Sequence, residues 1–77
     1  MQLSQLQKLI EQALPGAIVE VTSPDLVHFE AVVTYAGFAG KSRVQQQQMV
    51  YAALQPYIAS GEVHALALKT QLPTLTT

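Results

Sequence analysis

The chain lacks cysteine and tryptophan among its 77 residues, and only 12% of its residues are charged. Without cysteine it forms neither a disulfide nor a thiolate metal site, so histidine sets the limits of its metal chemistry. It has no apolar run of the roughly 20 residues that a membrane helix needs, and its N-terminus lacks the pattern of a secretion signal. We therefore expect a cytoplasmic protein without a membrane segment.

Positive charge is also scarce. Four Lys or Arg residues stand against five Asp or Glu residues, for a net charge of −1. The cations are scattered along the chain, whereas proteins that bind nucleic acid or anionic membranes gather them in a patch. We expect weak or absent binding to nucleic acid and none to membranes.

The length allows one small hydrophobic core, because short chains bury a limited share of their surface. With 49% apolar residues, the sequence predicts a single domain over residues 1–77. Residues 71–77 lack a hydrophobic pattern and are expected to form a disordered tail.

Hydrophobic spacing predicts a helix followed by a hairpin. Apolar residues recur three and four positions apart over residues 2–14, which is typical of an amphipathic helix, and Pro15-Gly16 ends it. Residues 17–22 and 28–35 alternate between apolar and polar, as strands do. The turn signal Ser23-Pro24-Asp25 between them predicts that the two strands pair.

The second half of the chain predicts a helix and a third strand. Ser42 is a suitable N-cap for a helix over residues 43–59, in which Pro56 predicts a kink or a loosened turn. Residues 62–69 form the predicted third strand. The order helix-strand-strand-helix-strand predicts an α/β (α+β) fold with a three-stranded mixed sheet and both helices on one face. The helix over 43–59 would be the crossover to a parallel strand.

Two histidines are the candidate metal ligands. His64 lies in an apolar run, on the same side as Leu66 and Leu68, which indicates either a core or rim histidine or a ligand near the start of its strand. His28 shares a face with Glu30, which indicates an exposed histidine paired with a carboxylate, or a ligand. Two histidines are too few for a closed zinc site, so a metal would be shared with a partner.

Motifs for catalysis and nucleic-acid binding are weak. No nucleophile elbow, acid-base carboxylate pair or phosphate loop occurs, so we do not expect an enzyme. Gly37 and Gly40 match the GxxG pattern of KH loops, and Lys41 and Arg43 follow them. The alternative is a pair of turn glycines before a helix, and a site neutralising so few phosphates would bind weakly. Gln45 to Gln48 predict a solvated helix face, or a face that hydrogen-bonds a partner without carrying charge.

Several segments together resemble the BolA family, from the first helix to Thr70. They are Phe38 with Gly40 to Val44, the helical stretch Gln48 to Tyr51 with Leu54, His28-Phe29, and above all Val63 to Leu66. The resemblance implies a fold similar to a class II KH domain, in agreement with the predicted element order.

The resemblance also implies a function. Members of this family are not enzymes; they partner monothiol glutaredoxins in iron–sulfur cluster trafficking and iron regulation. In such a heterodimer the glutaredoxin cysteine and glutathione hold one side of a [2Fe–2S] cluster, and the family's Val-His-Ala histidine, which His64 matches, binds the other. The family's second ligand is a histidine or cysteine between the first two strands; Thr22 to Val27 contains neither, which leaves His28 as the substitute.

Three hypotheses follow. The leading one is an adaptor that binds a monothiol glutaredoxin and ligates a shared [2Fe–2S] cluster through His64. On its own, this adaptor would bind no cluster. The alternative is a KH-like transcriptional regulator that binds nucleic acid through Gly37 to Arg43. Gln46 to Gln48 stand where many relatives carry a basic cluster, which weighs against it. The third is an interaction module that docks a partner, or a second copy of itself, without metal.

Overall fold

The computed structural model describes residues 2–25, 28–61, 63 and 65–73. Its elements follow the predicted order, with one additional 3-10 turn. They are α1 (Leu3–Ala13), β1 (Ile18–Thr22), β2 (His28–Thr34), η1 (Ala36–Phe38), α2 (Arg43–Ala59) and β3 (Ala65–Gln71). The boundaries of α2 are those predicted from its N-cap and from Ser60-Gly61.

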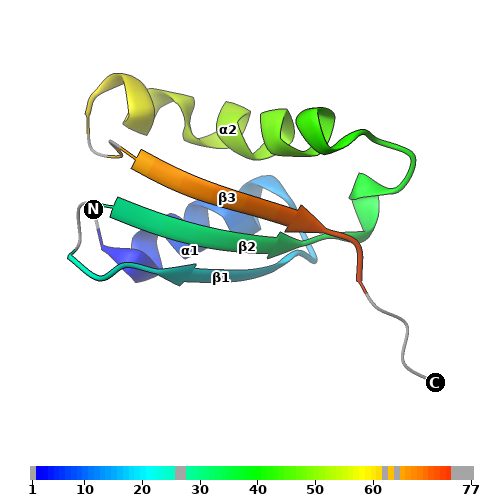
Figure 1. Cartoon of the computed structure of the whole chain (residues 1–77), viewed down its shortest axis with the longest axis horizontal. Coiled ribbons are helices and arrows are strands. Elements are labelled where there is room, and N and C mark those ends of the chain that lie inside the picture. The colour runs from blue at the N-terminus through cyan, green and yellow to red at the C-terminus, as the bar shows by residue number, and fades with distance from the viewer. Residues whose placement is uncertain (1, 26–27, 62, 64, 74–77) are drawn as a thin grey trace.

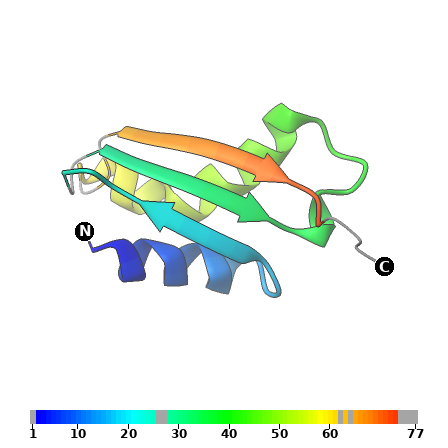
Figure 2. The same cartoon turned by 60° about the horizontal axis from the view of Figure 1, so that its bottom comes forward.

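The sheet has the order β1-β2-β3 (Figure 1). β1 pairs antiparallel with β2, which confirms the hairpin, and β3 pairs parallel with β2. A parallel neighbour requires a crossover, and α2 is that crossover. Both helices lie on the same side of the sheet (Figure 2), so the predicted α+β architecture is confirmed.

The core lies between the helices and one face of the sheet. Alternate residues of β2, namely Phe29, Ala31 and Val33, are buried there, as the strand period predicts. The helices contribute Leu6, Ile10, Val50 and Leu54. Phe38 of η1 is fully buried and packs edge-on against the ring of Tyr35, with the ring centroids 5.3 Å apart.

β3 lies further along the chain than predicted, because it begins at Ala65 and ends at Gln71. Val63, placed in the strand by the pattern, is instead buried beneath the end of α2, and its N–H donates to the carbonyl of Tyr57. Gln71, placed in the tail, belongs to the sheet: its carbonyl accepts from the N–H of Tyr35. Residues 74–77 of the predicted tail lie outside the described residues.

The ends of α2 show how local sequence and packing combine. Ser42 is the N-cap, and Ser42 and Gln45 form a reciprocal capping box that satisfies two free N–H groups. The sequence predicts a kink or a loosened turn at Pro56. In the structure, one helix runs without interruption from Arg43 to Ala59. Proline has no N–H to donate to the carbonyl four residues before it. Because Pro56 is exposed, that carbonyl lies on the solvent side of the helix.

The prediction of a solvated glutamine face is wrong for Gln46. Its amide nitrogen donates to the carbonyls of Lys41, at 3.0 Å, and Phe38, at 3.4 Å. Its amide oxygen accepts from Oγ1 of Thr70 at 2.8 Å. One side chain therefore ties the loop before α2 to both the helix and β3.

Two further side chains of α2 bind the outer edge of β3. The amide of Gln47 donates to the carbonyl of Leu68 at 3.4 Å, and the hydroxyl of Tyr51 donates to the carbonyl of Leu66 at 3.3 Å. Gln47 and Tyr51 are four residues apart, a rise of about 6 Å along the helix. Their acceptors are two residues apart, about 6.6 Å along the strand, so the donors and the acceptors are similarly spaced. α2 thus satisfies carbonyls that an edge strand would otherwise leave open.

Replacing Gln46 by alanine is expected to lower the free energy of unfolding by about 1–3 kcal/mol, because Thr70 and two loop carbonyls lose their partner. Gln48→Ala is the matched control: Gln48 is exposed on the same helix, and such a change is expected to stay within about 0.5 kcal/mol. Urea denaturation of both variants measures this. Equal losses in the two variants would contradict the assigned role of Gln46.

Candidate functional site

The candidate site lies at the end of the sheet where β2 and β3 begin. His28 is the first residue of β2, and its partner in the parallel register is Ala65, the first residue of β3. His64 directly precedes Ala65 in the sequence. The prediction for His64, including the face on which its ring lies, falls outside the described residues.

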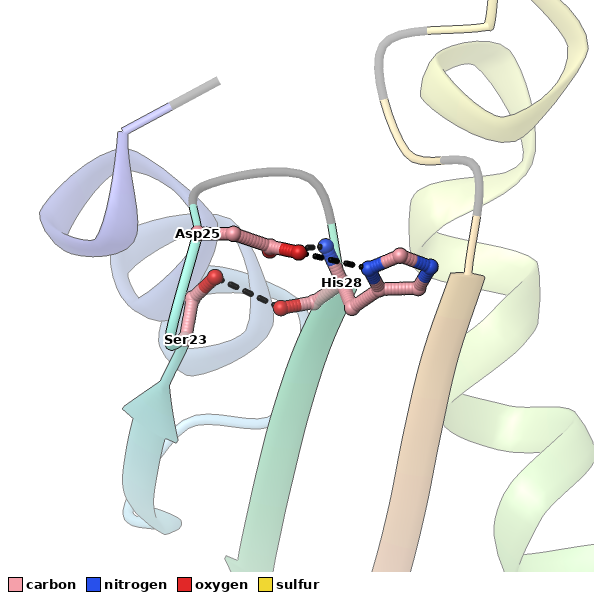
Figure 3. Close-up of polar contacts among 3 residues, drawn as sticks. All are labelled: Ser23, Asp25 and His28. Carbon is pink, nitrogen blue, oxygen red and sulfur yellow. Dashed lines mark hydrogen bonds and ion pairs between the residues drawn. The ribbon is translucent and has the colours of Figure 1, made fainter.

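His28 is held by a carboxylate from the loop before it (Figure 3). Oδ2 of Asp25 lies 2.8 Å from Nδ1 of the ring, and Oδ1 of Asp25 accepts from the main-chain N–H of His28 at 2.8 Å. The hydroxyl of Ser23 donates to the carbonyl of His28 at 2.6 Å. Three hydrogen bonds therefore fix both the main chain and the ring of this histidine.

The paired carboxylate is not the one that the strand pattern indicated. Glu30 shares an exposed face with His28, but the partner is Asp25, three residues before the histidine. The sequence does contain a relevant signal. An aspartate in a Ser-Pro-Asp turn tends to accept main-chain N–H groups a few residues on, and this geometry brings its second oxygen to the ring.

This arrangement leaves the lone pair of Nε2 of His28 available to bind a metal ion. The side chain is 68% exposed, and Figure 3 shows the ring extending towards the beginning of β3, with Nε2 on that side. When a carboxylate accepts the proton of Nδ1, the lone pair of a neutral imidazole is left on Nε2, which is the usual arrangement in metal-binding histidines.

The described residues do not form a closed metal site. No three His, Cys, Asp or Glu residues within that part of the chain gather closely enough to hold a metal ion. A metal ion bound by His28 would need further ligands from groups other than these residues.

The predicted GxxG site is better explained by packing. A Cβ atom on Gly37 would run into the ring of Tyr35, so this close approach favours glycine. Gly40 has a φ of 77°, a left-handed conformation that glycine adopts without strain. Lys41 and Arg43 are both exposed, and they lie beside these glycines in one segment. The structure thus favours turn glycines over a phosphate cradle.

Neither helix in the described part of the chain is long and apolar enough to cross a lipid bilayer.

Comparison with known proteins gives concordant results. The family model described as "BolA-like protein" matches residues 11–74. The "Acid stress protein IbaG" of Escherichia coli K12 is 37% identical over 73 residues, which are 95% of this chain and 86% of that protein.

Two solved structures are similar throughout. A BolA protein homologue from Coxiella burnetii superposes with a TM-score of 0.83 at 34% identity, covering 95% of this chain and 92% of that one. The BolA domain of SufE1 from Arabidopsis thaliana gives a TM-score of 0.79 at 26% identity, covering 91% and 89%.

Asp25→Ala is expected to shift the neutral ring of His28 from the Nδ1–H tautomer towards the Nε2–H tautomer, because the acceptor for Nδ1–H is removed. Long-range proton–nitrogen correlation spectra of the free protein at alkaline pH report the tautomer. Ser23→Ala is the control, because the hydroxyl of Ser23 donates to the main-chain carbonyl of His28 and its loss leaves the bond between Asp25 and the ring in place. A tautomer ratio that Asp25→Ala leaves unchanged would contradict this geometry.

Proposed function

The chain belongs to the BolA family, and from this premise we propose that it is a non-enzymatic adaptor in iron–sulfur cluster trafficking or iron regulation. It binds a monothiol glutaredoxin in the cytoplasm and forms a heterodimer bridged by a [2Fe–2S] cluster. The glutaredoxin cysteine and glutathione hold one iron. His64 ligates the other, and His28 is the candidate for the remaining position.

The observation that best supports this proposal is the geometry of His28. Its ring is exposed, its Nδ1 is engaged by Asp25, and its Nε2 is directed towards the start of β3. Ala65 is the register partner of His28, and His64 is the residue before Ala65 in the sequence. An exposed histidine whose register partner directly follows a second histidine in the sequence suits a centre shared with another protein.

The family comparisons support partnership at a coarser level. A BolA domain occurs within SufE1 of Arabidopsis thaliana, so in that protein this fold is joined to further sequence. The fold of this chain matches that domain over 91% of its length. We infer that this chain likewise works together with another polypeptide.

The proposed chemistry follows from replacing thiolate by imidazole. A neutral imidazole adds no negative charge to the cluster, whereas a thiolate adds one, and histidine ligation therefore raises the reduction potential. A chain without cysteine would thus change the properties of a cluster that it cannot hold alone. Asp25 contributes by orienting the ring of His28 and by holding the proton of the neutral ring on Nδ1.

Anaerobic copurification with a monothiol glutaredoxin, glutathione, iron and sulfide tests the proposal. We expect His64→Ala to remove or strongly alter the visible absorption and circular dichroism of the complex, and His28→Ala to alter the circular dichroism. Glu30→Ala is the matched control, since Glu30 is exposed on the same strand face as His28 and has no assigned contact with the cluster.

Unchanged spectra for His64→Ala would overturn the ligand assignment. A complex that forms equally well when iron is chelated, and that shows no cluster absorption, would instead identify a docking module without metal.

A further inference from the structure

One face of the sheet is left uncovered by the two helices. α1 and α2 both lie on the side where Phe29 and Val33 are buried (Figure 2). Because strand residues alternate between the two faces, His28 and Val32 lie on the opposite side, which we call the open face. No helix in the described part of the chain covers it. The exposed side chain of His28 therefore stands at one end of a free surface.

A shallow groove runs along the open face from the end where His28 lies. It has a volume of about 230 Å³ and is lined by residues of β2 and β3, namely Glu30, Ala31, Val32, Ala67, Leu68 and Lys69. In the parallel register Glu30 pairs with Ala67, two residues beyond the pair of His28 and Ala65. Two residues of strand span about 6.6 Å, so the groove begins next to the candidate site.

The groove combines apolar side chains with charged neighbours. Val32, which is half-buried, and Ala67, which is exposed, are its apolar side chains on the open face. Glu20 and Lys69 are the register partners of Val32 on the two neighbouring strands. Neither Glu20, Glu30 nor Lys69 forms an ion pair with another described residue. Two carboxylates against one amine leave this face acidic, which suits a partner surface that presents an apolar side chain beside cations.

We propose that the monothiol glutaredoxin docks on the open face and inserts an apolar side chain between Val32 and Ala67. This assignment rests on the proposed function and adds the surface that the partner covers. A specific interface buries about 600–1,000 Å² on each partner, which is more than the side chains of His28 and Asp25 supply. The contact therefore extends beyond the histidine, and the open face continues from it. A second copy of this chain would bring two acidic faces together, which disfavours it as the occupant.

Protection of a single introduced thiol tests the proposal. The chain has no cysteine, so Ala67→Cys in the groove and Ala52→Cys on the solvent side of α2 each carry one thiol at an exposed position. Mass spectrometry follows alkylation of each variant, alone and in the anaerobic complex with glutaredoxin, glutathione, iron and sulfide. Because an interface excludes solvent, we expect the complex to slow alkylation of Ala67→Cys at least about tenfold and that of Ala52→Cys less than about twofold.

Affinity gives a second readout. Ala67→Lys fills the groove and adds a cation, whereas Ala52→Lys adds the same charge on the far side of the molecule. Titration of each variant into glutaredoxin, followed by visible circular dichroism, is expected to show a Kd at least about tenfold higher for Ala67→Lys and within about twofold for Ala52→Lys. Loss of one rim carboxylate costs little affinity, so Glu30→Ala remains a control for the cluster spectra.

The outcomes separate the docking surface from the proposed function. Cluster absorption together with an Ala67→Cys thiol that reacts as fast as in the free chain would overturn the surface and leave the proposed function standing. Failure to form any complex with glutaredoxin would overturn both. Equal protection of the two thiols would show coverage that is not specific to the open face. Protection of Ala67→Cys in the free chain that rises with its concentration would instead identify a second copy as the occupant.

Discussion

The parallel pairing of β3 with β2 is the constraint on which the rest of the structure depends. A parallel neighbour cannot be reached by a tight turn, so the chain must cross over through α2. The same pairing brings the first residues of both strands to one end of the sheet, where His28 and Ala65 are register partners. It also carries the later part of β3 past the beginning of α2, where the hydroxyl of Thr70 donates to the amide oxygen of Gln46.

Uncharged side chains of α2 hold this arrangement together. Gln46, Gln47 and Tyr51 donate to main-chain carbonyls of the preceding loop and of β3. Amides and hydroxyls satisfy these carbonyls without the desolvation that buried charges would require.

Features set by local sequence were predictable, and those set by distant contacts were not. The hairpin followed from alternation, and α2 followed from the Ser42 cap. The start of β3 was placed too early because alternation does not reveal that Val63 closes α2 through Tyr57. The glutamine contacts depend on where β3 lies after the crossover. At the site, exposure of His28 was predictable, whereas its pairing with Asp25 required the geometry of the turn.

The central functional claim is that a histidine of this chain binds the iron of a shared cluster. The most direct measurement is pulsed electron paramagnetic resonance of the reduced heterodimer, with nitrogen-15 histidine only in this chain and an unlabelled glutaredoxin. The account predicts a nitrogen-15 hyperfine coupling typical of bound imidazole, which His64→Ala weakens. A fully formed cluster with no nitrogen-15 coupling from this chain would contradict it.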